Sequence, residues 1–231
     1  MPLSSDIKAI LFDLDGTLIE VPSLWSYFDD ILVELLKQYQ IPVPPLEERL
    51  DVWHSGGNFE GIIRGWGVLS YDEFIELFID KDLEKRREYV EEGRVCVYSD
   101  VSVLDALRQH VRLGLVTNTP PRIANFELDV FQLRRHFDSL VILGQVEQHI
   151  AKPEPDGFLR CLSQLHVAPA NAIMVGDSSS DIIGGHRAGV GTVLVRRPNQ
   201  PTPRDLPVEP DLIIDSFHEL LCLVELIPHD D

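Results

Sequence analysis

Short apolar runs of the kind that form buried strands recur along this 231-residue chain, and segments with helical spacing separate them. The runs lie at residues 8–12, 113–117, 139–143, 172–175, 192–195 and 211–214. Apolar residues three or four positions apart predict helices at residues 104–111, 123–131, 158–165 and 217–224. This alternation predicts a mostly parallel sheet with helices on both faces. We therefore expect an α/β fold with a doubly wound, Rossmann-like parallel sheet.

Residues 18–99 interrupt the alternation. Apolar stripes with helical spacing run from Trp25 to Leu36 and from Phe74 to Ile79, and no strand is predicted in this stretch. We expect an α-helical cap domain at residues 18–99, inserted into a core domain made of residues 1–17 and 100–231. The cap is expected to form a lid over the crevice at the edge of the sheet.

Two carboxylates follow the first apolar run, in the sequence DLDGT at residues 13–17. Side chains alternate along an extended backbone, so Asp13 and Asp15 are expected to face the same way. Gly16 would open a turn at the strand's carboxyl end, where open α/β sheets bind their ligands. One carboxylate could act as a nucleophile while the other moves protons, and together they could hold a cation.

Polar groups also follow three other apolar segments, where the predicted fold brings them to the same edge of the sheet. They are Thr117 and Asn118, then Lys152, then Asp177 and Asp181. Clusters of oxygen ligands suit Mg²⁺, and a lysine is a point-charge partner for phosphate. A metal, a lysine and a nucleophilic aspartate are the parts expected for phosphoryl transfer through an aspartyl-phosphate.

Four motifs carry a resemblance to a known family. In order they are DLDGT, Thr117-Asn118, Lys152-Pro153 and GDSSSD at residues 176–181. The chain resembles the haloacid dehalogenase superfamily, in the phosphoglycolate phosphatase-like branch that carries a helical cap, over about residues 8–196. The resemblance implies a Mg²⁺-dependent phosphatase that hydrolyses a phosphomonoester of a small phosphorylated metabolite through an aspartyl-phosphate.

The resemblance also implies a role for each carboxylate. Asp13 would be the nucleophile and a metal ligand. Asp15 would protonate the leaving-group oxygen and then deprotonate the attacking water, with its backbone carbonyl on the metal. Asp177 would be a further metal ligand, and Asp181 would complete the site directly or through a water. Capping of the following helix is the alternative role for Asp181.

The remaining motif residues would bind the phosphoryl group. By the same resemblance, Thr117, the backbone amide of Asn118 and Lys152 would hold its oxygens, and Lys152 would also offset the charge of Asp13.

Three residues of the predicted cap are candidates for substrate specificity. They are His54, Asn58 and Arg64, which lie near flexible glycines and aromatic residues. Arg64 is the best candidate for an anion contact, because a guanidinium suits carboxylate and phosphate. The alternative is that this segment only connects two helices.

Composition limits the partners and the location. The net charge is −18, and residues 18–99 contain 17 acidic but only 8 basic side chains. Such an acidic chain is not expected to bind nucleic acid or an anionic membrane. Three cysteines, the lack of a long apolar segment and an N-terminus without a basic-then-apolar pattern predict a cytoplasmic protein with reduced thiols. A monomer and a homodimer both remain open.

Two other functions remain as alternatives. A sugar-phosphate mutase of the β-phosphoglucomutase kind would share the same core, but no basic-and-hydroxyl constellation is evident in the predicted cap. A non-catalytic binding module could also keep the fold, although all the chemically required groups are present. Halide removal is disfavoured because it would leave Asp15 and Asp177 without a role.

Overall fold

The computed structural model describes residues 6–22, 24–54, 59–144, 148–198, 200, 202–203 and 206–224. The chain separates into two compact units. The core unit consists of Met1–Glu20 and Cys96–Asp231, and the cap unit is Val21–Val95.

The core unit is built on a six-stranded sheet in which every pair of neighbouring strands is parallel. The strands lie in the order β5-β4-β1-β6-β7-β8. Their bounds are β1 (Ala9–Phe12), β4 (Arg112–Thr117), β5 (Ser139–Ile142), β6 (Ala172–Gly176), β7 (Gly191–Val195) and β8 (Leu212–Ile214). The six predicted apolar runs therefore form the six strands, and the predicted doubly wound α/β fold is confirmed.

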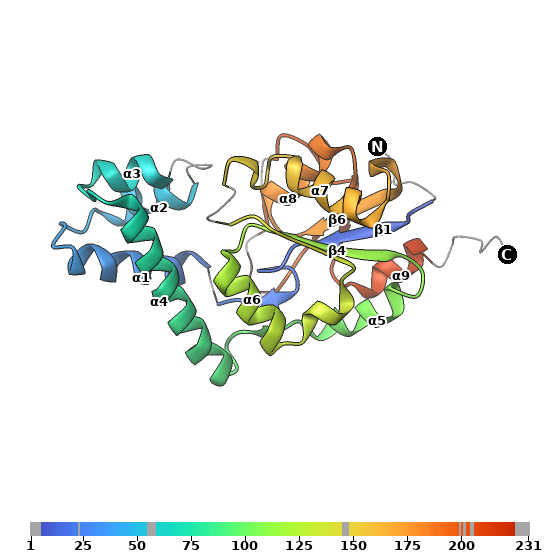
Figure 1. Ribbon diagram of the computed structural model, residues 1–231, viewed down its shortest axis with the longest axis horizontal. Helices are drawn as coiled ribbons and strands as arrows, with labels where there is room; N and C mark the ends of the chain where they lie inside the picture. Colours follow the sequence, from blue (N-terminus) through green and yellow to red (C-terminus); the bar gives the residue numbers. More distant parts are fainter. Residues whose placement is uncertain are drawn as a thin grey trace. The chain divides into compact units, whose positions relative to one another are not determined.

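Helices cover both faces of the sheet (Figure 1). On one face lie α7 (Asp156–Leu165) and α8 (Ser179–Ala188), and on the other lie α5 (Leu104–Leu107), α6 (Pro121–Val130) and α9 (His218–Val224). Short 3₁₀ segments complete the unit: η1 (Ser99–Val103), η2 (Leu133–His136), η3 (Gln148–Ile150) and η4 (Pro169–Asn171). Apolar side chains of α7 pack with residues of β1, β4 and β6 into one buried cluster. Burial of this apolar surface stabilises the packing of α7 against the sheet.

One predicted helix is shorter than expected. The apolar spacing at residues 104–111 predicts a helix to Val111, but α5 ends at Leu107. Val111 is buried for a different reason, because it leads directly into β4. Apolar spacing alone does not distinguish these two cases.

Strand β1 is the point where the winding of the sheet reverses. Residue Phe12 pairs with Leu115 of β4 on one side and with Val175 of β6 on the other. The carboxyl ends of these three neighbouring strands therefore meet at one edge, which is where open α/β sheets place their ligand sites.

A second, two-stranded sheet lies within the stretch for which no strand was predicted. Strand β2 (Ile19–Glu20) pairs antiparallel with β3 (Cys96–Val97), and both belong to the core unit. Strands of two residues are too short to show a hydrophobic period, so the prediction of no strand at residues 18–99 is wrong for this reason.

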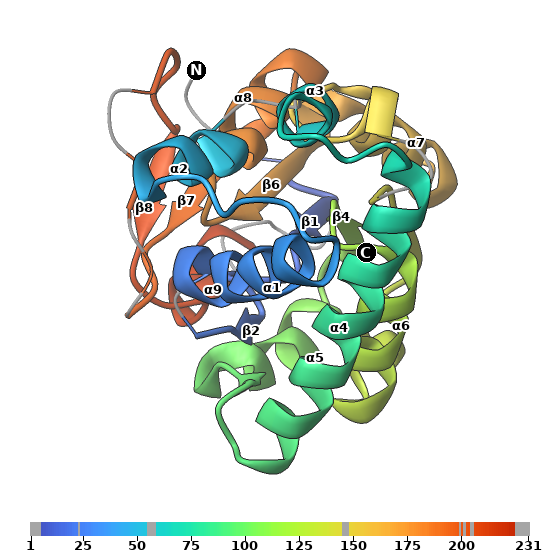
Figure 2. The same cartoon turned by 90° about the vertical axis from the view of Figure 1, so that its left-hand side faces the viewer.

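The cap unit is helical in its described residues. Its helices are α1 (Leu24–Gln38), α2 (Leu46–His54), α3 (Phe59–Gly65) and α4 (Tyr71–Glu91). Helices α1 and α4 pack together (Figure 2) and enclose a separate apolar core that includes Leu35 and Phe74. The cap thus has its own hydrophobic core.

A buried polar group lies inside the cap unit. The hydroxyl of Tyr27 donates to Asp82 Oδ1 at 2.5 Å, and Arg86 Nε donates to the same oxygen at 3.0 Å. All three side chains are buried, so these mutual hydrogen bonds offset the cost of removing them from water.

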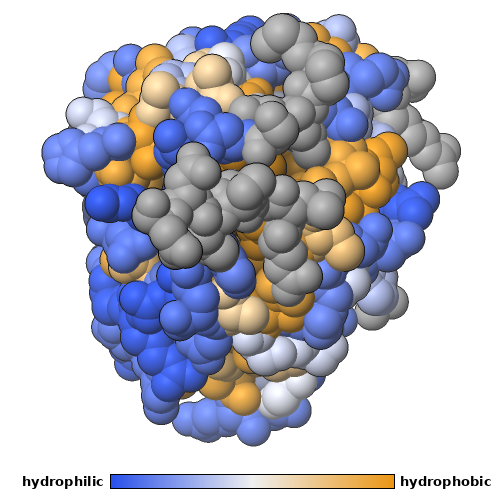
Figure 3. Space-filling view, turned by 90° about the vertical axis from the view of Figure 1, so that its right-hand side faces the viewer, coloured by the Kyte–Doolittle hydropathy of each residue, from blue (hydrophilic) through white to orange (hydrophobic). Residues whose placement is uncertain are grey.

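The face of the molecule in Figure 3 mixes hydrophilic and hydrophobic residues. Among the described residues, no helix combines the length and apolar character needed to cross a membrane.

Close packing around Gly114 in β4 makes a testable prediction. A Cβ atom there would lie 2.5 Å from Cys161 Sγ and 2.7 Å from Leu11 Cδ2. We expect Gly114→Ala to destabilise the protein by about 1–3 kcal/mol, because both neighbours are themselves packed in the core. Gly65→Ala is the matched control, since a Cβ there would meet no atom within 4 Å. Denaturant unfolding measures both, and equal stability of the two variants would contradict the prediction.

Candidate active site

The chain makes a tight turn directly after β1. The backbone N–H of Asp13 donates to the carbonyl of Val175 at 3.1 Å, which continues the parallel ladder to β6 by one residue. Gly16 has a φ of +77°, and a Cβ atom there would collide with the carboxylate of Asp177. The turn therefore needs glycine both for its left-handed backbone and for its close approach to Asp177.

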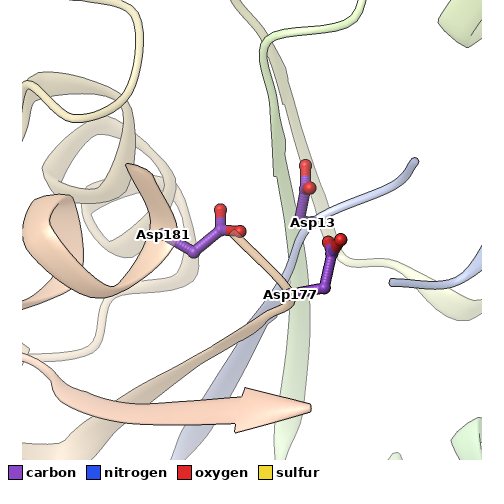
Figure 4. A group of neighbouring side chains, drawn as sticks. All are labelled: Asp13, Asp177 and Asp181. Atoms are coloured by element: carbon purple, nitrogen blue, oxygen red, sulfur yellow. The ribbon is translucent and has the colours of Figure 1, made fainter. Parts of the chain in front are cut away.

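Three carboxylates meet at this edge of the sheet (Figure 4). Asp13 follows β1, Asp177 follows β6, and Asp181 lies in the first turn of α8. One oxygen from each lies within 4.8 Å of the other two. All three were predicted as metal ligands from the sequence, and the fold brings them together.

Lys152 supplies a positive charge to this cluster. Its Nζ atom lies 2.6 Å from Asp13 Oδ1 and 2.6 Å from Asp181 Oδ1, and its side chain is only 2% exposed. The segment just before α7 is held by Asn118. The Asn118 side chain accepts from the backbone N–H of Lys152 and donates to its carbonyl, both at 2.9 Å. The side chain of Asn118 thus fixes the lysine, while its predicted role uses its backbone amide.

Burial sets the protonation of the cluster. It raises the pKa of Asp13 to about 8, because Lys152 offsets the loss of water only in part and Asp181 and Asp177 repel a further negative charge. It also raises the pKa of Asp177 to about 7, with Asp181 adding to the effect. The pKa of Lys152 is raised by the two carboxylates despite its burial, so the lysine stays charged.

The cluster is short of positive charge. Ionised Asp13, Asp177 and Asp181 would bring three negative charges to one positive charge on Lys152. Burial is the largest cause of the raised pKa values of Asp13 and Asp177, and repulsion from the neighbouring carboxylates adds to it. The donor set of carboxylate oxygens and the charge deficit together fit a divalent cation with hard-ligand preference.

Asp181 also caps the start of α8, which was the alternative role left open by the sequence. Its Oδ2 accepts from the backbone N–H of Ser178 at 3.1 Å and from the Ser178 hydroxyl at 2.6 Å. Its Oδ1 accepts from Lys152. The two roles are compatible, because the start of α8 orients one oxygen and leaves the other to face the cluster.

Asp15 is held by a residue that the sequence reasoning missed. Thr119 Oγ1 donates to Asp15 Oδ2 at 3.0 Å, and the hydroxyl of Thr117 donates in turn to Thr119 Oγ1 at 2.9 Å. The predicted phosphate-binding hydroxyl of Thr117 is therefore engaged with Thr119 in this structure. The position of Thr119 two residues after Thr117 was the available signal, since side chains at that spacing share a face in extended backbone.

Thr17 is the second residue that was missed. Its hydroxyl donates to Asp177 Oδ1 at 2.7 Å, across 160 positions of sequence. It lies within the DLDGT motif, so its place in the motif was a signal, but its partner could not be read from the sequence.

The predicted specificity residues lie in the cap unit. Asn58 and the side chain of His54 lie outside the described part of the chain. Arg64 is described and exposed, with its Nε donating to Glu60 Oε1 at 2.7 Å and its guanidinium 5.8 Å from the ring centre of Tyr71. These two contacts are to neighbours on α3 and α4, and the substrate role of Arg64 stays a prediction.

Comparison with known proteins identifies the family. The sequence profile of the haloacid dehalogenase-like hydrolases matches residues 10–195, which include the cap unit and all four motifs. The chain therefore belongs to this family of hydrolases. The predictions of the family and of a phosphatase-type enzyme are confirmed.

Similar proteins cover nearly the whole chain. A pyrophosphatase PpaX of Bacillus cereus is 30% identical over 216 residues, with 93% of this chain and 95% of that protein covered. Among solved structures, CbbY of Rhodobacter sphaeroides in complex with phosphate is 22% identical, with a TM-score of 0.73 and 95% and 99% of the two chains covered. A Haemophilus somnus protein described as a predicted phosphoglycolate phosphatase is 24% identical, with a TM-score of 0.64 and 94% and 98% covered. The two structures agree with the fold described above.

The raised pKa of Asp177 predicts a pH-dependent gain in stability for Asp177→Asn in metal-free protein. The folded-state pKa of about 7 lies above the ordinary value of 3.8, so ionisation of Asp177 costs stability increasingly as the pH rises from about 4 to 7. An asparagine avoids this cost and still accepts the Thr17 hydrogen bond. We expect the variant to be more stable than the unmodified protein by about 1–3 kcal/mol at pH 8.5, and by about a quarter of that difference at pH 4.5.

Chemical unfolding in chelator at the two pH values measures this difference. Asp51→Asn, at an exposed position of α2, is the control and should show no such pH dependence. A variant that is less stable than the unmodified protein at pH 8.5 would contradict the electrostatic description of the cluster.

Proposed function

We propose that this protein is a Mg²⁺-dependent phosphatase that hydrolyses a small-molecule phosphomonoester through an aspartyl-phosphate on Asp13. The observation that carries the proposal is the contact of Asp13 with Lys152 inside a cluster of three carboxylates, with Asp15 two residues away on the same turn. A nucleophile, a fixed cation and an acid–base group are the chemical requirements of this reaction.

Asp13, Asp177 and Asp181 are the residues that would hold Mg²⁺, together with the backbone carbonyl of Asp15. Their oxygen donors and their deficit of positive charge support this assignment. Bound Mg²⁺ would neutralise the carboxylates and polarise the phosphoryl oxygens.

Asp13 is the proposed nucleophile. A carboxylate oxygen of Asp13 forms a bond to phosphorus as the bond between phosphorus and the leaving oxygen breaks. The ammonium group of Lys152 favours the ionised form of Asp13, which is the reactive form. An ammonium has three N–H donors, and two of them meet Asp13 and Asp181; the third would bind a phosphoryl oxygen.

Asp15 is the proposed general acid and base. It gives its proton to the leaving oxygen in the first step and takes a proton from the attacking water in the second. That water forms a bond to phosphorus, and the bond between phosphorus and Asp13 breaks to release phosphate. The hydrogen bond from Thr119 holds the carboxyl group of Asp15 in place between these steps.

The phosphoryl oxygens would be held by Lys152, by the backbone amide of Asn118 and by Thr117. Thr117 would exchange its hydrogen bond to Thr119 for one to the phosphoryl group. This exchange is compatible with the reaction, because Thr119 keeps its own bond to Asp15.

The proposed substrate is a small phosphorylated metabolite. Pyrophosphate belongs among the substrates to be tested, because relatives that match over nearly their whole length are named pyrophosphatase. We place the reaction in the cytoplasm, a proposal supported by the three free cysteines.

Replacement of Asp13 by Asn tests the nucleophile. We expect Asp13→Asn to lower phosphate release by at least about 10³-fold, because an amide oxygen is a poor nucleophile and carries no charge. The measurement is phosphate release from a panel containing pyrophosphate, phosphoglycolate and a sugar phosphate, with Mg²⁺ and with chelator. Asp156→Asn, which changes an exposed aspartate in the first turn of α7, is the control and should keep full activity.

The panel also separates the competing functions. Metal-dependent release by the unmodified protein and the control, but not by Asp13→Asn, is the expected result. Substantial release by Asp13→Asn or release that ignores chelator would contradict the mechanism. Isomerisation of the sugar phosphate without phosphate release would indicate a mutase instead.

Replacement of Asp15 by Asn tests the acid–base role. We expect Asp15→Asn to lose about 10²–10⁴-fold in rate with alkyl phosphates and much less with an aryl phosphate, whose leaving oxygen needs no proton. The comparison of kcat for the two ester types measures the effect. An equal loss on both would exclude a role for Asp15 in protonating the leaving group.

A further inference from the structure

Arg197 is a buried cation outside all four motifs. It lies in the segment that follows β7, and its side chain is only 3% exposed. Its Nη1 donates to Asp100 Oδ2 at 2.8 Å, so its charge is paired. A buried ion pair of this kind gives little net stability compared with apolar side chains, so its contacts are the place to look for a role in fixing geometry.

The guanidinium of Arg197 is fixed in plane and in direction. It lies close to two aromatic rings, 4.1 Å from the ring centre of Tyr98 and 4.2 Å from that of Phe217. The carboxylate oxygen of Asp100 that binds Arg197 also accepts from the backbone N–H of Phe217 at 2.8 Å. These contacts hold the guanidinium rigidly, which a flexible ammonium could not reproduce.

The remaining donors of Arg197 reach the turn after β1. Its Nη2 and Nε both donate to the backbone carbonyl of Thr17, at 2.7 Å and 3.1 Å. The hydroxyl of the same Thr17 donates to Asp177 Oδ1 at 2.7 Å. A continuous chain of hydrogen bonds therefore runs from Arg197 through Thr17 to a carboxylate of the metal-binding cluster.

Asp177 also packs closely against the turn after β1. Its carboxylate lies against Gly16, with its Cγ 2.8 Å from the place where a Cβ would stand. A shift of the turn at Gly16 and Thr17 would therefore move or release Asp177.

We propose that Arg197 is a positioning residue that sets the metal affinity of the site by clamping the carbonyl of Thr17 and, through the Thr17 hydroxyl, orienting Asp177. This inference rests on the proposed function, which assigns Mg²⁺ to the three carboxylates. It adds Arg197 as a determinant of metal affinity, a residue that lies 180 positions from Thr17 and outside every motif.

Arg197→Lys is the test variant, because lysine keeps the charge beside Asp100 but lacks the planar group that contacts both rings and binds the carbonyl with two nitrogen atoms. Arg196→Lys is the matched control. Arg196 is the neighbouring residue, and its guanidinium forms an exposed two-bond ion pair with Asp215. The probe is Mg²⁺ alone, titrated into the full chain by calorimetry, with thermal unfolding of each metal-free variant measured alongside.

We expect Arg197→Lys to weaken Mg²⁺ binding about five- to tenfold, and Arg196→Lys to leave it unchanged. Thr17→Val, which removes the hydroxyl but keeps the branched shape, should weaken binding to a similar degree. In the double variant, the effect of Arg197→Lys should largely disappear, because the path to Asp177 is already cut. With substrate at saturating Mg²⁺, the KM of Arg197→Lys should stay close to that of the unmodified protein.

Three results would overturn the inference. They are unchanged Mg²⁺ binding in Arg197→Lys, an undiminished effect of Arg197→Lys in the Thr17→Val background, and no Mg²⁺ binding by the unmodified protein. If Arg197→Lys does not fold, Asp100→Asn reaches the same guanidinium from its other side and should weaken Mg²⁺ binding in the same direction; unchanged binding there would also overturn it. Mg²⁺ binding without phosphate release from the substrate panel would count against the proposed function and not against this inference.

Discussion

The balance of charge at the carboxyl end of β1 is the constraint on which the rest of the site depends. Three carboxylates with oxygens within 4.8 Å of one another repel, and burial deprives them of water. Lys152 offsets part of this cost by contacting Asp13 and Asp181 at 2.6 Å. Neutral partners then fix the charged groups: Asn118 holds the backbone of Lys152, Ser178 holds Asp181, and Thr17 holds Asp177. The structure thus stabilises the cluster through oriented hydrogen bonds and leaves a deficit of positive charge that suits a cation.

The sheet makes this arrangement possible because its winding reverses at β1. The register that pairs Phe12 with both Leu115 and Val175 brings the ends of β1, β4 and β6 side by side. Asp13 and Asp177 follow two of these strands, and Thr117 ends the third. Glycine at position 16 lets the turn approach Asp177 more closely than any side chain would allow. The chemistry is therefore concentrated where these chain segments meet, and the first turn of α8 adds Asp181 to it.

Much of this could be predicted from local sequence. The apolar runs indicated all six strands of the main sheet, and the order of the motifs indicated the carboxylates and the lysine that the fold brings together. The two-residue strands β2 and β3 could not be predicted, because they are too short to have a period. The helix expected to reach Val111 ends at Leu107, because a buried residue before a strand resembles the end of an apolar stripe. For Arg64, the sequence indicated an anion-binding group but not its contacts with Glu60 and Tyr71.

The sequence by itself determined the six strands of the main sheet and the chemical groups that follow them, since burial imposes a local period on side chains. Only the tertiary structure decided the partners. Thr119 holds Asp15 from 104 positions away, and Arg197 reaches the carbonyl of Thr17 across 180 positions. Such pairs depend on the order and register of the strands, which are set by packing over the whole core unit. No local pattern of residues encodes that packing, so these positioning contacts emerge only when the chain is folded.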